Sequence, residues 1–157
     1  VIRDSILAAS SQLDTTMFGP GTLDESHRRR SIYFMIKRSR LIPIMQVFDQ
    51  PEPLVSQGSR PSTTIAPQAL LFMNNPQVVK WAHGLAQNLD AGQPNEAIRQ
   101  LYLRTLTREP TLAELTDSRA FFDSQSTSYS KEKNAAQLAL ADLCQVMLSL
   151  NEFIYLP

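Results

Sequence analysis

Basic side chains gather in one short stretch of this 157-residue chain, and they are the first residues that could bind a ligand. Six of the fifteen lysines and arginines lie between positions 28 and 40. One interpretation is an anion site for phosphate, nucleic acid or an acidic polymer. The other is ion pairing that braces the loops. Lys+Arg and Asp+Glu both number 15, and this zero net charge argues against nucleic-acid binding. The acids available for pairing are Asp14, Asp24, Glu25 and Asp49.

A second group of polar side chains follows between positions 60 and 75. These hydroxyl and amide groups could receive a sugar, and they are equally suited to capping helices, which cap preferences favour. If this stretch folds against the basic cluster, both would line one groove. We expect instead that Arg30, Arg60 and Gln68 are used in internal hydrogen bonds. The candidate ligand- or anion-binding residues are Arg29, Arg30, Arg60, Thr63, Thr64 and Gln68.

Other reactive side chains are few and isolated. His27 and His83 stand alone, and two lone histidines do not make a zinc site. Cys144 is the only cysteine, which excludes an internal disulfide framework and a paired-cysteine haem attachment, and its apolar neighbours predict a buried, inert thiol. Asp49 and Glu52 are the nearest pair for glycoside hydrolysis, which needs two carboxyls roughly 5–9.5 Å apart. We therefore assign no catalytic, cofactor-binding or metal-ligating residue, and an enzyme is not favoured.

The second half of the sequence predicts the helices that would position these residues. Asn75 followed by Pro76 is typical of a helix start, and that helix should close at 90–92. Pro94 opens a second helix that we expect to end at 109–110. Thr111 and Glu114 form a capping-box pattern at the start of a third. The apolar side of that third helix should consist of Leu112, Leu115 and Phe122.

The last predicted helix has the widest apolar face. Ala139, Val146 and Phe153 widen its main stripe, so we expect one continuous helix at the centre of a bundle. Burying one such leucine or isoleucine contributes roughly 1.5–3 kcal/mol, so packing should dominate this half. The main stripe consists of Ala136, Leu140, Leu143, Met147, Leu150 and Ile154.

The first half is punctuated by prolines and should be rich in loops. Alternation over 32–37 is compatible with a short strand, but no second good strand candidate follows to pair with it, so an extended or helical stretch packed on the bundle is the alternative. The segments 41–48 and 67–73 predict short helices, the second with Thr64 as a candidate cap. The fold class expected is all-α, with at most one short strand pair. Residues 1–157 should form a single domain with no membrane span. Because Val1 begins within a helical pattern, we expect a carboxy-terminal fragment of a larger multidomain protein.

Taken as an ordered set, several stretches across the chain carry a family resemblance. They are Ile2-Arg3-Asp4-Ser5-Ile6-Leu7, Arg29-Arg30-Ser31-Ile32-Tyr33, Phe48-Asp49-Gln50-Pro51, Ser62-Thr63-Thr64-Ile65-Ala66-Pro67-Gln68-Ala69-Leu70, Met73-Asn74, Leu106-Thr107-Arg108-Glu109-Pro110-Thr111 with Glu114, Leu143-Cys144-Gln145 and Asn151-Glu152-Phe153-Ile154-Tyr155. Together they resemble the planctomycete-specific domain near the carboxy terminus of large exported proteins, known as domain of unknown function 1553.

The resemblance implies a periplasmic or extracellular location and an upstream partner domain. It also implies that a c-type cytochrome segment can be present in the parent protein, so any haem would lie outside this chain. The family supplies no catalytic residues to carry over.

Three functions remain open from the sequence. The first is a non-catalytic helical module that docks onto upstream domains of the same parent chain. The second is binding or processing of an acidic or sulfated polysaccharide by the basic cluster and the 60–64 loop. The third, supported only by the resemblance, is docking to a c-type cytochrome.

Overall fold

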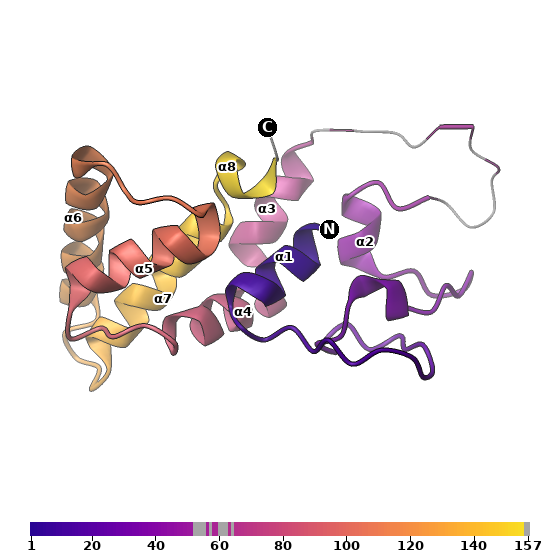
Figure 1. Cartoon of the computed structure of the whole chain (residues 1–157), viewed down its shortest axis with the longest axis horizontal. Coiled ribbons are helices and arrows are strands. Elements are labelled where there is room, and N and C mark those ends of the chain that lie inside the picture. Colours follow the sequence, from indigo (N-terminus) through magenta and orange to yellow (C-terminus); the bar gives the residue numbers. More distant parts are fainter. Residues whose placement is uncertain (52–55, 57, 60–62, 64, 156–157) are drawn as a thin grey trace.

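Helices account for the architecture in the computed structural model, which describes residues 1–51, 56, 58–59, 63 and 65–155 (Figure 1). Within these residues there are eight α-helices, one 3-10 helix and no β-strand, which confirms the all-α class. None of the described helices is both long and apolar enough to cross a membrane. In chain order the elements are α1 (Ile2–Ala9), η1 (Ser31–Tyr33), α2 (Pro43–Val47), α3 (Ala66–Asn74), α4 (Pro76–Ala86), α5 (Pro94–Leu106), α6 (Leu112–Ser128), α7 (Ala135–Leu148) and α8 (Asn151–Ile154).

Helix α7 is the centre of the core, as its wide apolar face predicts. It packs mainly against α4 and α6, and α5 covers α6 and α7. Leu140 and Leu148 of α7, Leu85 of α4 and Leu101 of α5 are completely buried. Each such burial contributes roughly 1.5–3 kcal/mol, so this cluster supplies most of the driving force for folding.

The predicted caps start α4 and α6. The backbone N–H of Gln77 donates to the side chain of Asn75 at 2.8 Å, and Pro76 occupies the first helical position. At α6 the Thr111 N–H donates to Glu114 at 2.7 Å, and the Glu114 N–H donates back to the Thr111 hydroxyl at 3.3 Å. These reciprocal bonds satisfy backbone donors that a helix start leaves free, which confirms the capping box.

The helices differ from the predictions in four places. Helix α4 stops at Ala86 rather than at 90–92, because the N–H groups of Asn88 and Leu89 donate to carbonyls three residues back, as in a 3-10 turn. Helix α5 stops at Leu106 rather than at 109–110, because Thr107 takes the left-handed conformation (φ 57°) that closes a helix. Leu112 does not join the apolar side of α6, since it lies at the first helical position and is 85% exposed. Val146 is also largely exposed and adds nothing to the buried face of α7.

The predicted continuous last helix is wrong, because it breaks between Leu148 and Asn151. The Ser149 hydroxyl donates to the carbonyl of Gln145 at 2.7 Å, a local bond of the kind that bends helices. Leu150 then takes an extended conformation, and α8 restarts in a new direction. Arg108 contributes to fixing α8, because its guanidinium bonds Glu152 and Glu114 at 2.7 Å each.

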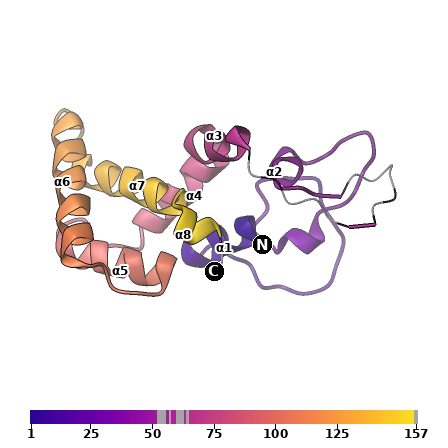
Figure 2. The ribbon, with the colours of Figure 1, turned by 90° about the horizontal axis from the view of Figure 1, so that it is seen from above.

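The first half is largely irregular, as its prolines predict, and it lies at the opposite end of the molecule from α6 (Figure 2). The predicted helices at α2 and α3 are confirmed. Of the alternatives left open for 32–37, the segment does not form a strand among the described residues. Its first residues form the 3-10 turn η1, and only isolated bridges such as Thr22 with Phe34 occur among the described residues. No second extended run is available to pair with it, so the chain closes a turn instead. The candidate cap Thr64 lies outside the described residues.

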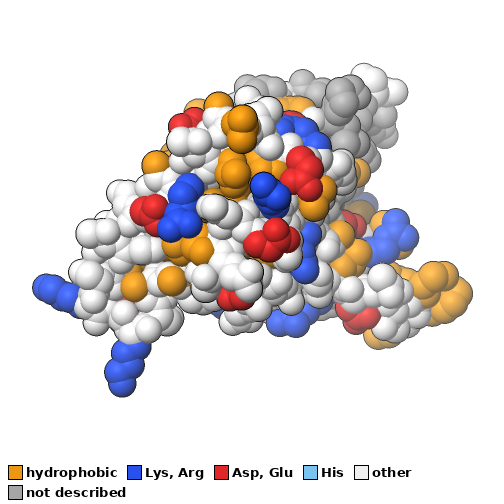
Figure 3. Space-filling view, turned by 60° about the vertical axis from the view of Figure 1, so that its left-hand side comes forward, with side chains coloured by type: hydrophobic (Ala, Val, Ile, Leu, Met, Phe, Trp, Pro, Cys, Tyr) orange, Lys and Arg blue, Asp and Glu red, His pale blue; other side chains and the backbone are white. Residues whose placement is uncertain are grey.

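The surface over α5 and α6 carries no dominant charge. Figure 3 shows acidic and basic side chains interspersed with small apolar areas on the face that these helices present. Because the positive and negative side chains offset one another, this face produces little long-range electrostatic field, in keeping with the zero net charge of the chain.

Candidate functional site

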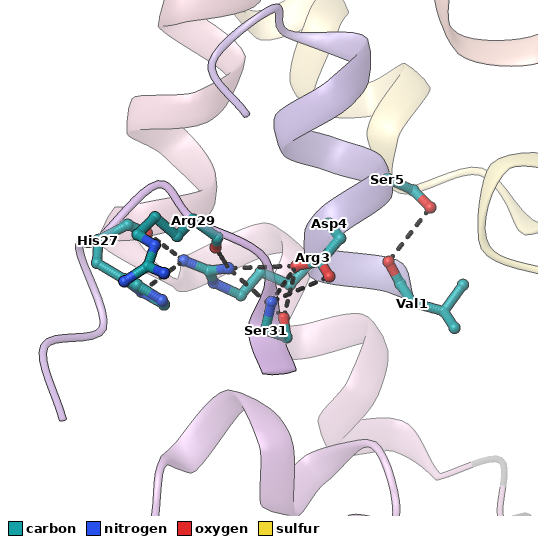
Figure 4. Close-up of polar contacts among 7 residues, drawn as sticks. All are labelled: Val1, Arg3, Asp4, Ser5, His27, Arg29 and Ser31. Carbon is teal, nitrogen blue, oxygen red and sulfur yellow. Dashed lines mark hydrogen bonds and ion pairs between the residues drawn. The ribbon is translucent and has the colours of Figure 1, made fainter. Parts of the chain in front are cut away.

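The most deeply buried charged side chain among the described residues is Arg3, which the sequence did not single out. Arg3 lies on α1 and is only 3% exposed. One of its terminal nitrogens donates to the Arg29 carbonyl at 2.9 Å. The other is 3.0 Å from Nδ1 of His27 and also donates to the His27 carbonyl. A helix side chain therefore supplies the hydrogen bonds that the irregular backbone around 27–29 lacks (Figure 4).

Asp4, the next residue on α1, adds contacts on the other side. We call Arg3, Asp4, His27, Ser31 and the backbone of Arg29 the Arg3 cluster. The Asp4 carboxylate accepts from the Ser31 N–H at 2.9 Å and from the Ser31 hydroxyl at 2.6 Å. It also forms an ion pair with Arg3 at 3.3 Å. The Ser31 hydroxyl therefore acts as a hydrogen-bond donor to the Asp4 carboxylate. These bonds hold the start of η1 against α1.

Burial sets the electrostatics of the cluster. Desolvation lowers the pKa of Arg3, and Asp4 opposes the shift. Burial also lowers the pKa of His27, and the positive charge of Arg3 adds to that effect. The His27 ring packs on Phe34 with 4.4 Å between centroids, and the Arg3 guanidinium lies 4.8 Å from the Phe34 centroid. A neutral imidazole between an arginine and an aromatic ring suits a packing role.

Arg29, a predicted site residue, points into its own loop. Its guanidinium donates to the carbonyls of Thr16 and Pro20 at 3.3 Å each and to that of Phe18. It also stacks over the Tyr33 ring, with 3.5 Å to the centroid. These contacts occupy most of its donors, so Arg29 braces the 16–20 loop.

The structure brings Gln68 and Thr63 into contact, and Gln68 is buried. The buried Gln68 amide donates to the carbonyls of Thr63 at 2.9 Å and Val47 at 3.1 Å. Thr63 in turn donates from its N–H and its hydroxyl to Asp49, at 2.8 Å each. This network ties the segment before α3 to the end of α2. Arg60 and Thr64 lie outside the described residues.

Among the described site residues, Arg30 and Thr63 are exposed. The expected internal hydrogen bond from the Arg30 side chain is not found among the described contacts. Arg30 precedes η1 and lines a shallow groove at the start of α1. It does not join Gln68 among the described contacts, so those two residues form no common cleft there.

The expected pairing of the basic cluster with nearby acids is not what the described residues show. Asp14, Asp24 and Asp49 accept mainly from N–H and hydroxyl groups close by, of Thr16, Ser26 and Thr63 respectively. Those bonds lower the pKa of all three carboxyls. Asp14 and Asp24 therefore each close a local turn, whereas Asp49 holds Thr63, fourteen residues along the chain, against the end of α2. Glu52, the proposed hydrolytic partner of Asp49, is outside the described residues.

Comparison with known families now places the chain. A family model matches residues 1–122, and the family is described as PSD1, a protein of unknown function (DUF1553). The chain belongs to the DUF1553 family. Neither the curated proteins nor the solved structures gave a match. The DUF1553 match spans α1 to most of α6, so it includes the Arg3 cluster and all six predicted site residues.

The single cysteine of this DUF1553 chain is used in packing. Cys144 is completely buried in α7, and burial raises its pKa well above the ordinary value. Within the described residues, no three histidine, cysteine or acidic side chains come close enough to hold a metal. Arg3 was missed because a single arginine between Ile2 and Asp4 leaves no periodic signal. Its only sequence clue is its position on the inward face that Ile6 and Leu7 define.

Proposed function

We propose that this DUF1553 chain is a non-catalytic helical interaction module of an exported multidomain protein, and that its partner is the segment of the same protein preceding Val1. The observation that carries this proposal is an apolar groove of about 530 Å³ at the start of α1. Val1 is itself part of the lining. An upstream domain of the same protein, which the family resemblance implies, would join the chain beside this groove.

The lining suits a short apolar segment. Ala8 and Met45 supply the apolar walls with Val1, and Ile32 adds a large side chain that is 68% exposed. Arg30 and the half-buried Asp4 are also in the lining and supply one charge of each sign. Protein interfaces likewise combine apolar side chains with polar and charged ones. Leaving Ile32 in water forgoes roughly 1.5–3 kcal/mol that a partner would recover.

A structural use of the polar groups supports the non-catalytic part of the proposal. The Ser31 hydroxyl is bonded to Asp4, His27 packs between Arg3 and Phe34, and Cys144 is buried. These three groups, which could act as nucleophile or base, are used in hydrogen bonding or packing within the fold.

The test uses a synthetic peptide covering the thirty or so residues that precede Val1 in the parent gene, titrated into this chain by calorimetry. Ile32→Asp should weaken binding about 10- to 100-fold, since it places a charge where an apolar side chain is expected. Ile36→Asp is the matched control, because Ile36 is 65% exposed and lies outside the groove. Equal loss from both variants, or no binding by the wild-type chain, would exclude this partner.

A further inference from the structure

A second groove lies at the other end of α1 and is polar throughout. It has a volume of about 650 Å³, which is within the size range of small-molecule sites. It runs between the end of α1, the loop at 26–28 and the exposed side of α4. Its lining consists of Ser10, Ser11, Gln12, Ser26, Arg28, Gln77, Lys80, His83, Gly84, Gln87 and Asn88.

Three basic side chains face this groove. Arg28 comes from the basic cluster, while Lys80 and His83 lie three residues apart on the same side of α4. Among the described contacts their side chains make no hydrogen bond or ion pair, and none of the lining residues is acidic. A concave surface lined by one sign of charge concentrates the field and attracts anions.

The floor of the groove is fixed before any ligand arrives. The Gln12 amide lies directly over Gly84, where a Cβ would collide with it, and donates to the Trp81 carbonyl at 3.3 Å. The Asn88 amide donates to the carbonyls of Ser10 at 3.2 Å and Gly84 at 2.9 Å. These bonds join α1 to α4 and leave the amide oxygens of Gln12 and Asn88 as acceptors.

We propose that this groove binds a sulfated or phosphorylated oligosaccharide. The guanidinium and ammonium groups of Arg28 and Lys80 suit an oxyanion, with which they form strong charge-assisted hydrogen bonds. The glutamine, asparagine and serine side chains both donate and accept, as sugar hydroxyls do. No phenylalanine, tyrosine or tryptophan is among the lining, so the groove lacks the large aromatic platforms on which nucleobases usually stack.

Binding is measured by calorimetry with a heparin-derived tetrasaccharide, its desulfated form, a phosphorylated mannose oligosaccharide and adenosine monophosphate. We expect the two anionic sugars to bind, the desulfated form to bind at least tenfold more weakly, and affinity to fall with salt. The ratio of the two anionic sugars decides between sulfate and phosphate. Preference for the nucleotide, or equal binding of the desulfated form, would overturn the proposal.

Matched variants locate the site. Lys80→Ala and Arg28→Ala should each weaken binding roughly 10- to 100-fold, the loss expected for one charge-assisted hydrogen bond. Arg38→Ala removes the same charge from an exposed position in the basic cluster, outside the groove, and should change affinity less than twofold. If Arg38→Ala weakens binding as much as Lys80→Ala, the attraction comes from general charge and the groove is not the site.

Discussion

Replacing Arg3 with alanine should destabilise this protein more than any exposed arginine substitution. The side chain is buried and holds the carbonyls of Arg29 and His27 together with the ring of His27. Alanine would leave these acceptors without a donor and would leave Asp4 without its ion pair. The loop at 27–31 would then lose its attachment to α1 on one side.

The magnitude follows from those contacts. Hydrogen bonds from a charged group contribute about 1.5–3 kcal/mol each, and the energy regained by no longer burying the guanidinium offsets part of their loss. Removing one partner of a buried charged network typically costs roughly 3–5 kcal/mol. That is a large fraction of a total stability of about 5–15 kcal/mol. At about 2–4 °C per kcal/mol for a chain of this length, Tm should fall by roughly 6–20 °C.

The assay combines urea unfolding with hydrogen exchange. Arg99→Ala is the control, because Arg99 is exposed on α5, and it should change stability by less than about 0.5 kcal/mol. Exchange in Arg3→Ala should speed up most for amides of the Arg3 cluster, such as Ser31, and least for α7. The reasoning is refuted if Arg3→Ala loses less than about 1 kcal/mol or if the Ser31 amide stays protected.

Three further outcomes can be checked on the same protein. The folded state lowers the pKa of His27 below its ordinary 6.5, so the stabilising contribution of the neutral imidazole is present above that pH and lost as pH falls. His27→Gln should therefore make the free energy of unfolding depend less steeply on pH, which unfolding at several pH values measures. Gly84→Ala should displace the Gln12 amide and destabilise the chain, whereas in a Gln12→Ala background it should stabilise by about 0.5–1 kcal/mol, which a double-mutant cycle measures. Cys144 should react with a thiol reagent only as fast as the protein opens, and rapid labelling under native conditions would contradict its burial.

The helices after residue 75 were predictable because their signals are local. The cap at Asn75 and the box at Thr111 need only residues within one turn, and both are confirmed. The break after Leu148 was not predictable from periodicity, since the apolar spacing continues through it. The interruption depends on a hydroxyl bonding backward and on an ion pair from Arg108, a residue more than forty positions away.

The candidate site was less predictable because its partners are distant in sequence. Arg28 belongs to an obvious cluster, but nothing in the sequence places it beside Lys80 and His83. Gln68 was recognised as a polar candidate, yet its use inside the fold depends on the carbonyl of Val47. Hydrogen bonds from side chains to loop carbonyls determine the conformation of this half of the molecule. Every residue type carries the same backbone carbonyl, so the sequence does not indicate which carbonyl accepts such a bond.

The position of α7 has a consequence for synthesis of the chain on the ribosome. Residues 1–122, the part that the family model recognises, end within α6, whereas α7 covers both α4 and α6. A nascent chain stopped there would display the faces around Leu85 and Phe122 to solvent until the last helix emerged. The stretch that the family model matches is therefore shorter than the stretch needed to bury the core. A chain truncated at residue 122 should aggregate as a partly folded intermediate does.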